Sequence, residues 1–139
     1  MKTSSLCKAC FLFAISANFL VLFPASSFLF GQEQDISGTW TGDAIMPGST
    51  EANRVTLVLE KTDDSSYKGR ITDSRGLAKD AVLEGVSFQN GNLRSRFAIS
   101  LNGKEISMRA GVNVLLGRLI GALWAENSPG TPLDLARSK

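Results

Sequence analysis

The sequence predicts an all-β fold, an antiparallel up-and-down meander of about eight short strands that curls into a barrel. The first observation is that apolar and polar residues alternate through most of residues 36–137, which is the period of a strand with one buried face. The second is that Asn-Gly pairs at 90–91 and 102–103 separate such segments, and these pairs favour two-residue hairpin turns. A sheet with one apolar face loses its exposed edges when it closes, so a barrel is expected, with an open sandwich as the alternative.

Each expected strand is a stretch of this alternation between polar loops. The strands cover residues 36–42, 55–60, 67–72, 81–88, 93–101, 105–112, 118–125 and 132–137. In the fourth strand the alternation slips at Glu84-Gly85, as a β-bulge would make it. The last strand is expected to pair with the first and so close the sheet.

Two hairpins allow the pairing register to be predicted. In the later Asn-Gly hairpin, a two-residue loop sets Phe97 opposite Met108, so that apolar side chains meet on the buried face. In the hairpin around residues 62–66, Glu60 falls opposite Lys68 on the other face, where opposite charges attract. Both hairpins give pairs that suit their faces, which supports the meander.

Residues 112–123 leave two alternatives. They are apolar on both faces, and Leu115, Leu119 and Leu123 are also spaced like the apolar stripe of a helix. Glycines in and beside the segment oppose a helix, because glycine is a poor helix former. Two strand ends around a turn near Leu116-Gly117 are therefore expected.

The N-terminal segment has the order of a secretory signal. An apolar run over residues 9–23 follows Lys2 and Lys8, and residues 24–27 supply a proline and then small side chains. A basic start, an apolar core and a small-residue cleavage site define such a signal.

The expected domains are a signal peptide over residues 1–31, cleaved near 27–31, and a single β-barrel domain over 32–139. The protein is therefore expected outside the cytoplasm, either secreted or periplasmic. An uncleaved anchor is the alternative, because the apolar region extended to Phe30 reaches the ~20 residues that span a bilayer. Contact with a membrane is expected only through that anchor.

Composition limits the chemistry. Lys2 and Lys8 account for the whole formal net charge of +2, so the rest of the chain is neutral and no nucleic-acid partner is expected. The chain has no histidine, and its cysteines, Cys7 and Cys10, both lie in the expected signal. Triads that need histidine or cysteine, zinc sites built on these ligands and thiol redox chemistry are thus excluded. No enzyme activity, cofactor or metal is expected.

The segment Gly38-Thr39-Trp40-Thr41-Gly42 resembles the start of calycin-type barrels, which are the lipocalins, fatty-acid-binding proteins and avidins. Residues 117–124 are similar to the closing strands of small secreted bacterial barrels of this type. The resemblance implies an eight-stranded meander in which Trp40 plugs one end. It also implies that an arginine from a late strand, Arg118 or Arg137, covers that tryptophan.

The inner face offers a first candidate site, for a small and largely apolar ligand. Small residues are expected to point inward at Gly38, Gly69, Ser95, Ala110 and Gly121, where they either leave a pocket or receive larger neighbours. The residues expected to contact such a ligand are Trp40, Leu57, Ile71, Phe97, Ile99, Met108 and Leu123.

The outer face offers a second candidate site. The predicted register sets Arg96 opposite Arg109, with Arg94 two residues along. Trp124 is expected to face outward or to lie at the rim, where it either contacts a sugar or partner or packs under the C-terminal tail. Like charges that face each other across strands are unfavourable, so solvent, an acid such as Glu84, or a bound anion should compensate. This face supports the alternative function, a module with a filled barrel that binds an extracytoplasmic protein or polysaccharide, for example an inhibitor of a secreted enzyme.

Overall fold

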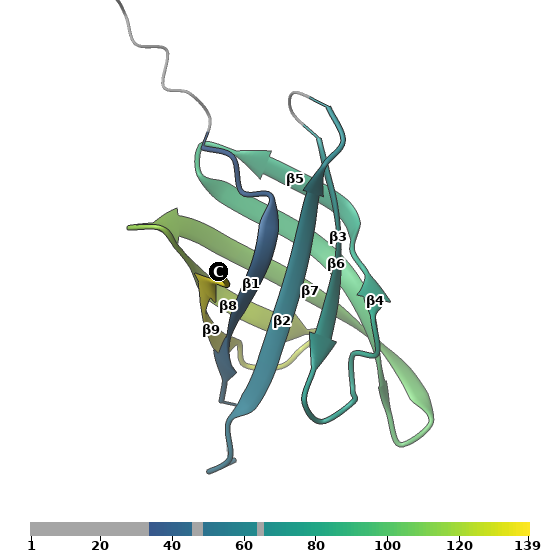
Figure 1. The fold of residues 1–139 in the computed structure, drawn as a ribbon. Helices are drawn as coiled ribbons and strands as arrows, with labels where there is room; N and C mark the ends of the chain where they lie inside the picture. Colours follow the sequence, from purple (N-terminus) through teal and green to yellow (C-terminus); the bar gives the residue numbers. More distant parts are fainter. Residues whose placement is uncertain (1–33, 46–48, 64–65) are drawn as a thin grey trace, which may run out of the picture. The chain divides into compact units, whose positions relative to one another are not determined.

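The structure is a computed structural model, and it describes residues 34–45, 49–63 and 66–139 (Figure 1). The contacts within the chain separate residues 1–30 from residues 31–139, so every described residue belongs to the second unit. The expected signal peptide lies outside the described residues. Within them, no helix has the length and apolar character that crossing a membrane requires.

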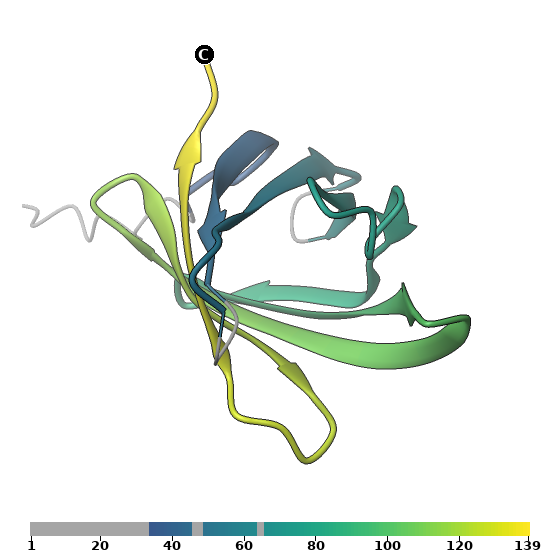
Figure 2. The same ribbon diagram turned by 90° about the horizontal axis from the view of Figure 1, so that it is seen from below.

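The described residues form strands and no helix, which confirms the all-β class. The strands are β1 (Gly38–Ala44), β2 (Asn53–Lys61), β3 (Tyr67–Asp73), β4 (Ala81–Val82), β5 (Glu84–Gln89), β6 (Asn92–Leu101), β7 (Lys104–Leu115), β8 (Arg118–Ala125) and β9 (Thr131–Arg137). All neighbours pair antiparallel in one sheet, in the order β4-β3-β2-β1-β9-β8-β7-β6-β5. The first and last strands meet at the centre of this order, so the meander curls into a nearly closed barrel (Figure 2).

The barrel has a seam where the sequence predicted one continuous strand. Residues 81–88 form the two strands β4 and β5, which is why the described chain has nine strands and not eight. The register shifts between Glu84 and Ser87, and Gly85 adopts a positive φ of 56°. The chain passes from β4 to β5 at Leu83, whose N–H bonds to the Gly69 carbonyl oxygen of β3 at 2.9 Å, while the bulge itself lies within β5.

The predicted registers are confirmed. Phe97 lies opposite Met108, and Glu60 lies opposite Lys68, with 2.8 Å between the Lys68 Nζ and a Glu60 carboxylate oxygen. The predicted pair of Arg96 and Arg109 is also present. Period-two alternation with one buried face leaves little freedom, because a slip of one residue would turn every side chain to the wrong face.

Three tight turns share one backbone conformation. The φ values are 51° and 74° in Asn90-Gly91, and they are 52° and 75° in Asn102-Gly103. Leu116-Gly117 has 50° and 74°. Positive φ at both central residues is the type I′ pattern, and it places a turn between β7 and β8. The strand-turn-strand alternative for residues 112–123 is thus confirmed.

Trp40 lies in the core near one end of the barrel. It is 1% exposed, and its indole N–H donates to the Ile36 carbonyl oxygen at 2.9 Å. The guanidinium carbon of Arg137 lies 4.8 Å from the centre of a Trp40 ring. Arg118, the other candidate for this position, pairs with Asp134 at 2.7 Å. The arrangement is compatible with a calycin-like barrel.

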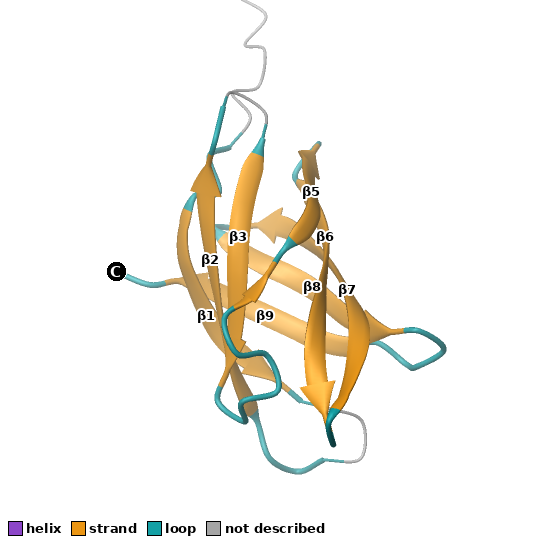
Figure 3. Ribbon diagram, turned by 90° about the vertical axis from the view of Figure 1, so that its right-hand side faces the viewer, coloured by secondary structure: helices purple, strands orange, loops and turns teal. Residues whose placement is uncertain are grey.

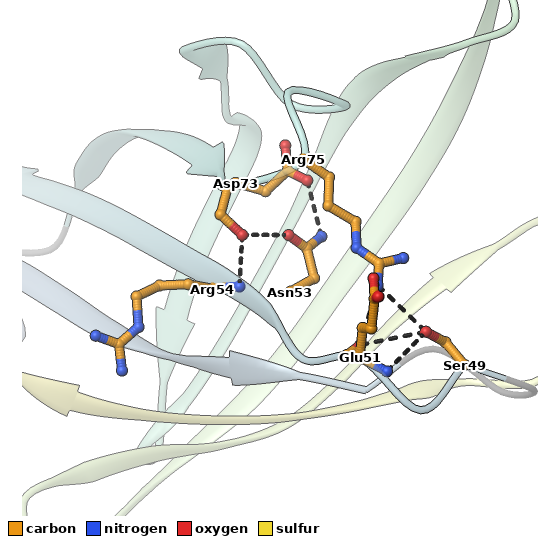
Figure 4. A network of polar contacts seen from close by, with 7 residues as sticks. Ser49, Glu51, Asn53, Arg54, Asp73 and Arg75 are labelled. Carbon is orange, nitrogen blue, oxygen red and sulfur yellow. Dashed lines mark hydrogen bonds and ion pairs between the residues drawn. The ribbon is translucent and has the colours of Figure 1, made fainter.

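A polar network ties the loop after β3 to the start of β2 (Figure 4). The Asn53 side-chain amide donates to the Asp73 carboxylate at 2.7 Å, and the Ser74 hydroxyl donates to the Asn53 side-chain oxygen at 3.1 Å. The other Asp73 carboxylate oxygen accepts the Ala78 N–H at 2.7 Å. These bonds hold Leu77 and Ala78 against the core at the end opposite Trp40.

Candidate functional site

Around the expected ligand contacts, the interior that the structure describes is nearly filled. Ile71, Phe97, Ile99, Met108 and Leu123, all expected ligand contacts, line one cavity of about 30 Å³. Leu57 and Trp40 are buried elsewhere in the core. A space of this size suits about one water molecule, whereas a cavity that takes up benzene measures about 150 Å³.

Neighbouring groups fill the space beside two of the small inward residues. A Cβ added at Gly69 would lie 2.8 Å from a Leu59 methyl carbon and 3.0 Å from a Leu83 methyl carbon. One added at Gly121 would lie 2.0 Å from the Gly111 carbonyl oxygen. At Gly69 and Gly121 the structure therefore matches the second expectation, in which neighbouring groups pack into the space that small residues leave. Gly38, expected to point inward, is exposed.

The outer face carries a much larger hollow. A groove of about 870 Å³ lies over β6, β7 and β8, which run side by side in Figure 3. It brings together every residue of the predicted outer site, Arg94, Arg96, Arg109 and Trp124. Its other lining residues are Gly85, Asn92, Ser95, Ala110, Gly111, Asn113, Ala125, Glu126, Asn127 and Ser128.

The first row of the groove runs across three strands. Arg96 of β6 lies opposite Arg109 of β7, and Arg109 lies opposite Trp124 of β8. These residues point outward because their strand neighbours, such as Met108 and Leu123, are buried. Two guanidinium groups and one indole ring are thus neighbours on one surface.

The second row forms the floor beneath the tryptophan. It contains Arg94, Gly111 and Ala122, paired across the same three strands. A Cβ at Gly111 would lie 2.9 Å from two carbons of the Trp124 ring, and one at Gly130 would lie 2.7 Å from its nitrogen. The indole therefore lies over backbone at two glycines, and 39% of the residue stays exposed.

The third row fixes one of the arginines. The Asn92 side-chain amide donates to the Asn113 side-chain oxygen at 2.9 Å. The Arg94 guanidinium donates to the Asn92 side-chain oxygen, also at 2.9 Å. Sequence reasoning did not single out these asparagines, although the predicted register of β6 and β7 already sets them opposite each other.

The groove holds three arginines that have neither an acidic nor an aromatic partner among the described residues. Elsewhere in the described chain, Arg54, Arg70, Arg75 and Arg118 each form an ion pair, with Asp43, Asp80, Glu51 and Asp134 respectively. No hydrogen bond or ion pair within residues 34–45, 49–63 and 66–139 engages the Arg96 or Arg109 guanidinium group. Glu84 faces Arg96 in the register but forms no ion pair with it, and Glu126 is the acidic residue of the lining.

Comparison with models of known families, with curated proteins and with solved structures finds no match. Nor do the described residues contain three or more His, Cys, Asp or Glu side chains placed to hold a metal ion. The class that the fold defines is an all-strand, nearly closed antiparallel barrel.

Proposed function

We propose that this domain is a non-catalytic binding module that takes an anionic ligand in the outer groove. The observation that carries the proposal is that Arg94, Arg96 and Arg109, the arginines without an ion pair or aromatic partner among the described residues, converge there beside an exposed tryptophan. Exported as its N-terminus predicts, the protein would meet this ligand outside the cytoplasm.

The energetics of the arginine pair support binding. Like charges directly opposite across strands destabilise a sheet by roughly 0.2–1 kcal/mol. Arg96 faces Arg109, and although Glu84 lies opposite Arg96 in the register, neither guanidinium group forms an ion pair within the described residues. A bound anion would convert this repulsion into attraction, because guanidinium groups bind carboxylate and phosphate oxygens in pairs. A repulsion between Arg96 and Arg109 that lowers the stability of the free protein is therefore expected of a site preformed for an anion.

The first expectation, an apolar ligand inside the barrel, has less support. The interior cavity of about 30 Å³ is far below the roughly 300–1,000 Å³ typical of ligand pockets, whereas the groove of about 870 Å³ lies within that range. We therefore propose that the barrel interior stabilises the fold and that the outer face binds the ligand.

The same barrel supports a proposed relation to calycins. Trp40 is buried under Arg137, an arginine of the last strand, as the resemblance at Gly38-Thr39-Trp40 implies. The proposed relation concerns the fold alone, because the groove lies on the outside of the barrel.

Intrinsic fluorescence gives a direct test. Trp40 is buried, so a ligand in the groove changes the emission of Trp124. We expect dextran sulfate to change this emission and neutral dextran to leave it unchanged, and the response should weaken as salt rises. The double variant Arg96→Gln/Arg109→Gln should lose the response.

The matched control is Arg54→Gln. Arg54 is an outward arginine of β2 that pairs with Asp43, and it lies outside the groove. This variant should bind like the wild type. A wild type that binds no polyanion, or a double variant that binds as well as the wild type, would show that the groove is not an anion site.

A further inference from the structure

We infer that the groove binds an acidic polysaccharide, a chain of sugar rings that carry carboxylates, with one ring on Trp124 and its carboxylate at the arginines. The inference rests on the proposed function and names its ligand class. It is carried by the position of the indole relative to the unpaired guanidinium groups.

The indole provides a flat apolar surface with polar groups at its edges. Its ring lies over Gly111, where a side chain would occupy the same space, and the residue remains partly exposed. Arg94 lies opposite Gly111, and Arg109 lies opposite Trp124 itself. A sugar ring has an apolar face of C–H groups and a polar rim, so it can contact the indole while its rim reaches these arginines.

The spacing of the strands fits a carboxylate attached to that ring. Neighbouring strands lie about 4.8 Å apart. The backbone of Arg109 on β7 is therefore one strand away from Trp124, and that of Arg96 on β6 is roughly 10 Å away. The carboxylate of a uronic acid lies close to its ring, so it can reach Arg109 one strand away, and the long side chain of Arg96 can extend toward it from the next strand. Arg109 and Arg96 can then bind its two oxygens with charge-assisted hydrogen bonds.

The asparagine row extends the site along the strands. Asn92 and Asn113 lie two rows beyond Arg96 and Arg109, which corresponds to about 13 Å because each residue advances a strand by about 3.3 Å. Their bond to each other uses one amide hydrogen of Asn92, which leaves donors for sugar hydroxyls. The groove is therefore longer than one ring, and it fits a chain.

Other polyanions fit less well. Proteins that hold single-stranded nucleic acid stack successive bases on several aromatic side chains along a strongly basic track. The lining has one aromatic residue, and the chain from residue 32 onward is neutral. A chain of acidic residues such as polyglutamate would use the arginines but has no sugar ring to contact Trp124. It is therefore the natural competitor in the test.

The test compares three ligands by calorimetry with the purified protein. Oligogalacturonate carries ring and charge, its methyl ester carries the ring alone, and polyglutamate carries charge alone. We expect oligogalacturonate to bind at least about ten-fold more tightly than either of the others, which is the effect of one added favourable contact.

Two variants isolate the ring contact. Trp124→Ala removes the indole, and Gly111→Ala leaves the indole present but displaces it, since the new methyl would lie 2.9 Å from the ring. Each should weaken oligogalacturonate binding by about ten-fold or more and leave polyglutamate binding unchanged. Urea melts confirm that each variant is folded.

The outcomes separate this inference from the proposed function. If oligogalacturonate binds no more tightly than polyglutamate, or if Trp124→Ala weakens both equally, the polysaccharide inference is wrong and the anion groove stands. If Arg96→Gln/Arg109→Gln binds every ligand as well as the wild type, both the groove and its ligand are wrong.

Discussion

Trp40 is the residue whose loss should damage the barrel most. Its side chain is 1% exposed, its indole N–H bonds to the Ile36 carbonyl oxygen, and Arg137 covers the ring. Replacement by alanine removes all three contacts at once and leaves a cavity at the end of the core. No disulfide links the described residues, since the cysteines of the chain lie at positions 7 and 10.

The size of the effect follows from these contacts. Cutting a buried aromatic residue to alanine costs about 3–5 kcal/mol, which includes the cavity that remains. The Ile36 carbonyl loses a hydrogen bond worth about 1 kcal/mol, and Arg137 loses a cation–π contact worth about 0.5–1 kcal/mol. These contributions overlap, so we expect Trp40→Ala to lower the free energy of unfolding by about 4–5 kcal/mol. Small domains have only about 5–15 kcal/mol in total, so a large fraction of the variant should be unfolded.

Urea denaturation followed by circular dichroism measures this loss. The midpoint should fall steeply while the slope stays constant, because the surface exposed on unfolding hardly changes. Trp124→Ala is the matched control, since that residue is 39% exposed, and it should cost less than about 2 kcal/mol. If Trp40→Ala stays within about 1 kcal/mol of the wild type while Trp124→Ala unfolds, the assignment of inside and outside is wrong.

Three further substitutions test separate parts of the structure. Leu116→Asn should raise the free energy of unfolding by about 1 kcal/mol, because Leu116 has a φ of 50° and is fully exposed in a turn where asparagine is favoured. A lower melting temperature would contradict this. Arg109→Ser should leave stability unchanged or raise it by up to about 1 kcal/mol at low salt, since it removes the repulsion with Arg96, and a clear loss in thermal melts would show a structural role instead. Asp35→Asn should weaken the pH dependence of stability below about pH 4. Hydrogen bonds from Ser37 lower the pKa of Asp35, so the charged carboxylate stabilises the fold at neutral pH and this contribution is lost as the pH falls through the lowered pKa. If the melting temperatures of the wild type and the variant change in parallel from pH 7 to about pH 2.5, this prediction is wrong.

Local pattern was sufficient to predict most of the strands, their order and much of their pairing. Alternation fixes which side chains share a face, and Asn-Gly at residues 102–103 fixes the loop length, so the opposition of Arg96 and Arg109 follows by counting. The same counting would have placed Asn92 opposite Asn113. These features depend on residues close in sequence, which is why the sequence alone determines them.

The tertiary structure decided what depends on residues far apart in the chain. The choice of Arg137 over Arg118 as the cover of Trp40 depends on the register of β9 against β1, which no short loop fixes. The division into β4 and β5 falls at Leu83, where the chain leaves its pairing with β3 and begins to pair with β6. The interior volume depends on how side chains of every strand interdigitate, so small inward residues did not produce a pocket.

The groove illustrates both sources of information. The sequence identified its arginines and Trp124 as outward residues, because outward direction follows from alternation. That they share one hollow depends on Gly111 and Gly130, which let the indole lie against the backbone of a neighbouring strand and loop. Side-chain size at positions from three strands creates the hollow, and only the assembled sheet brings those positions together.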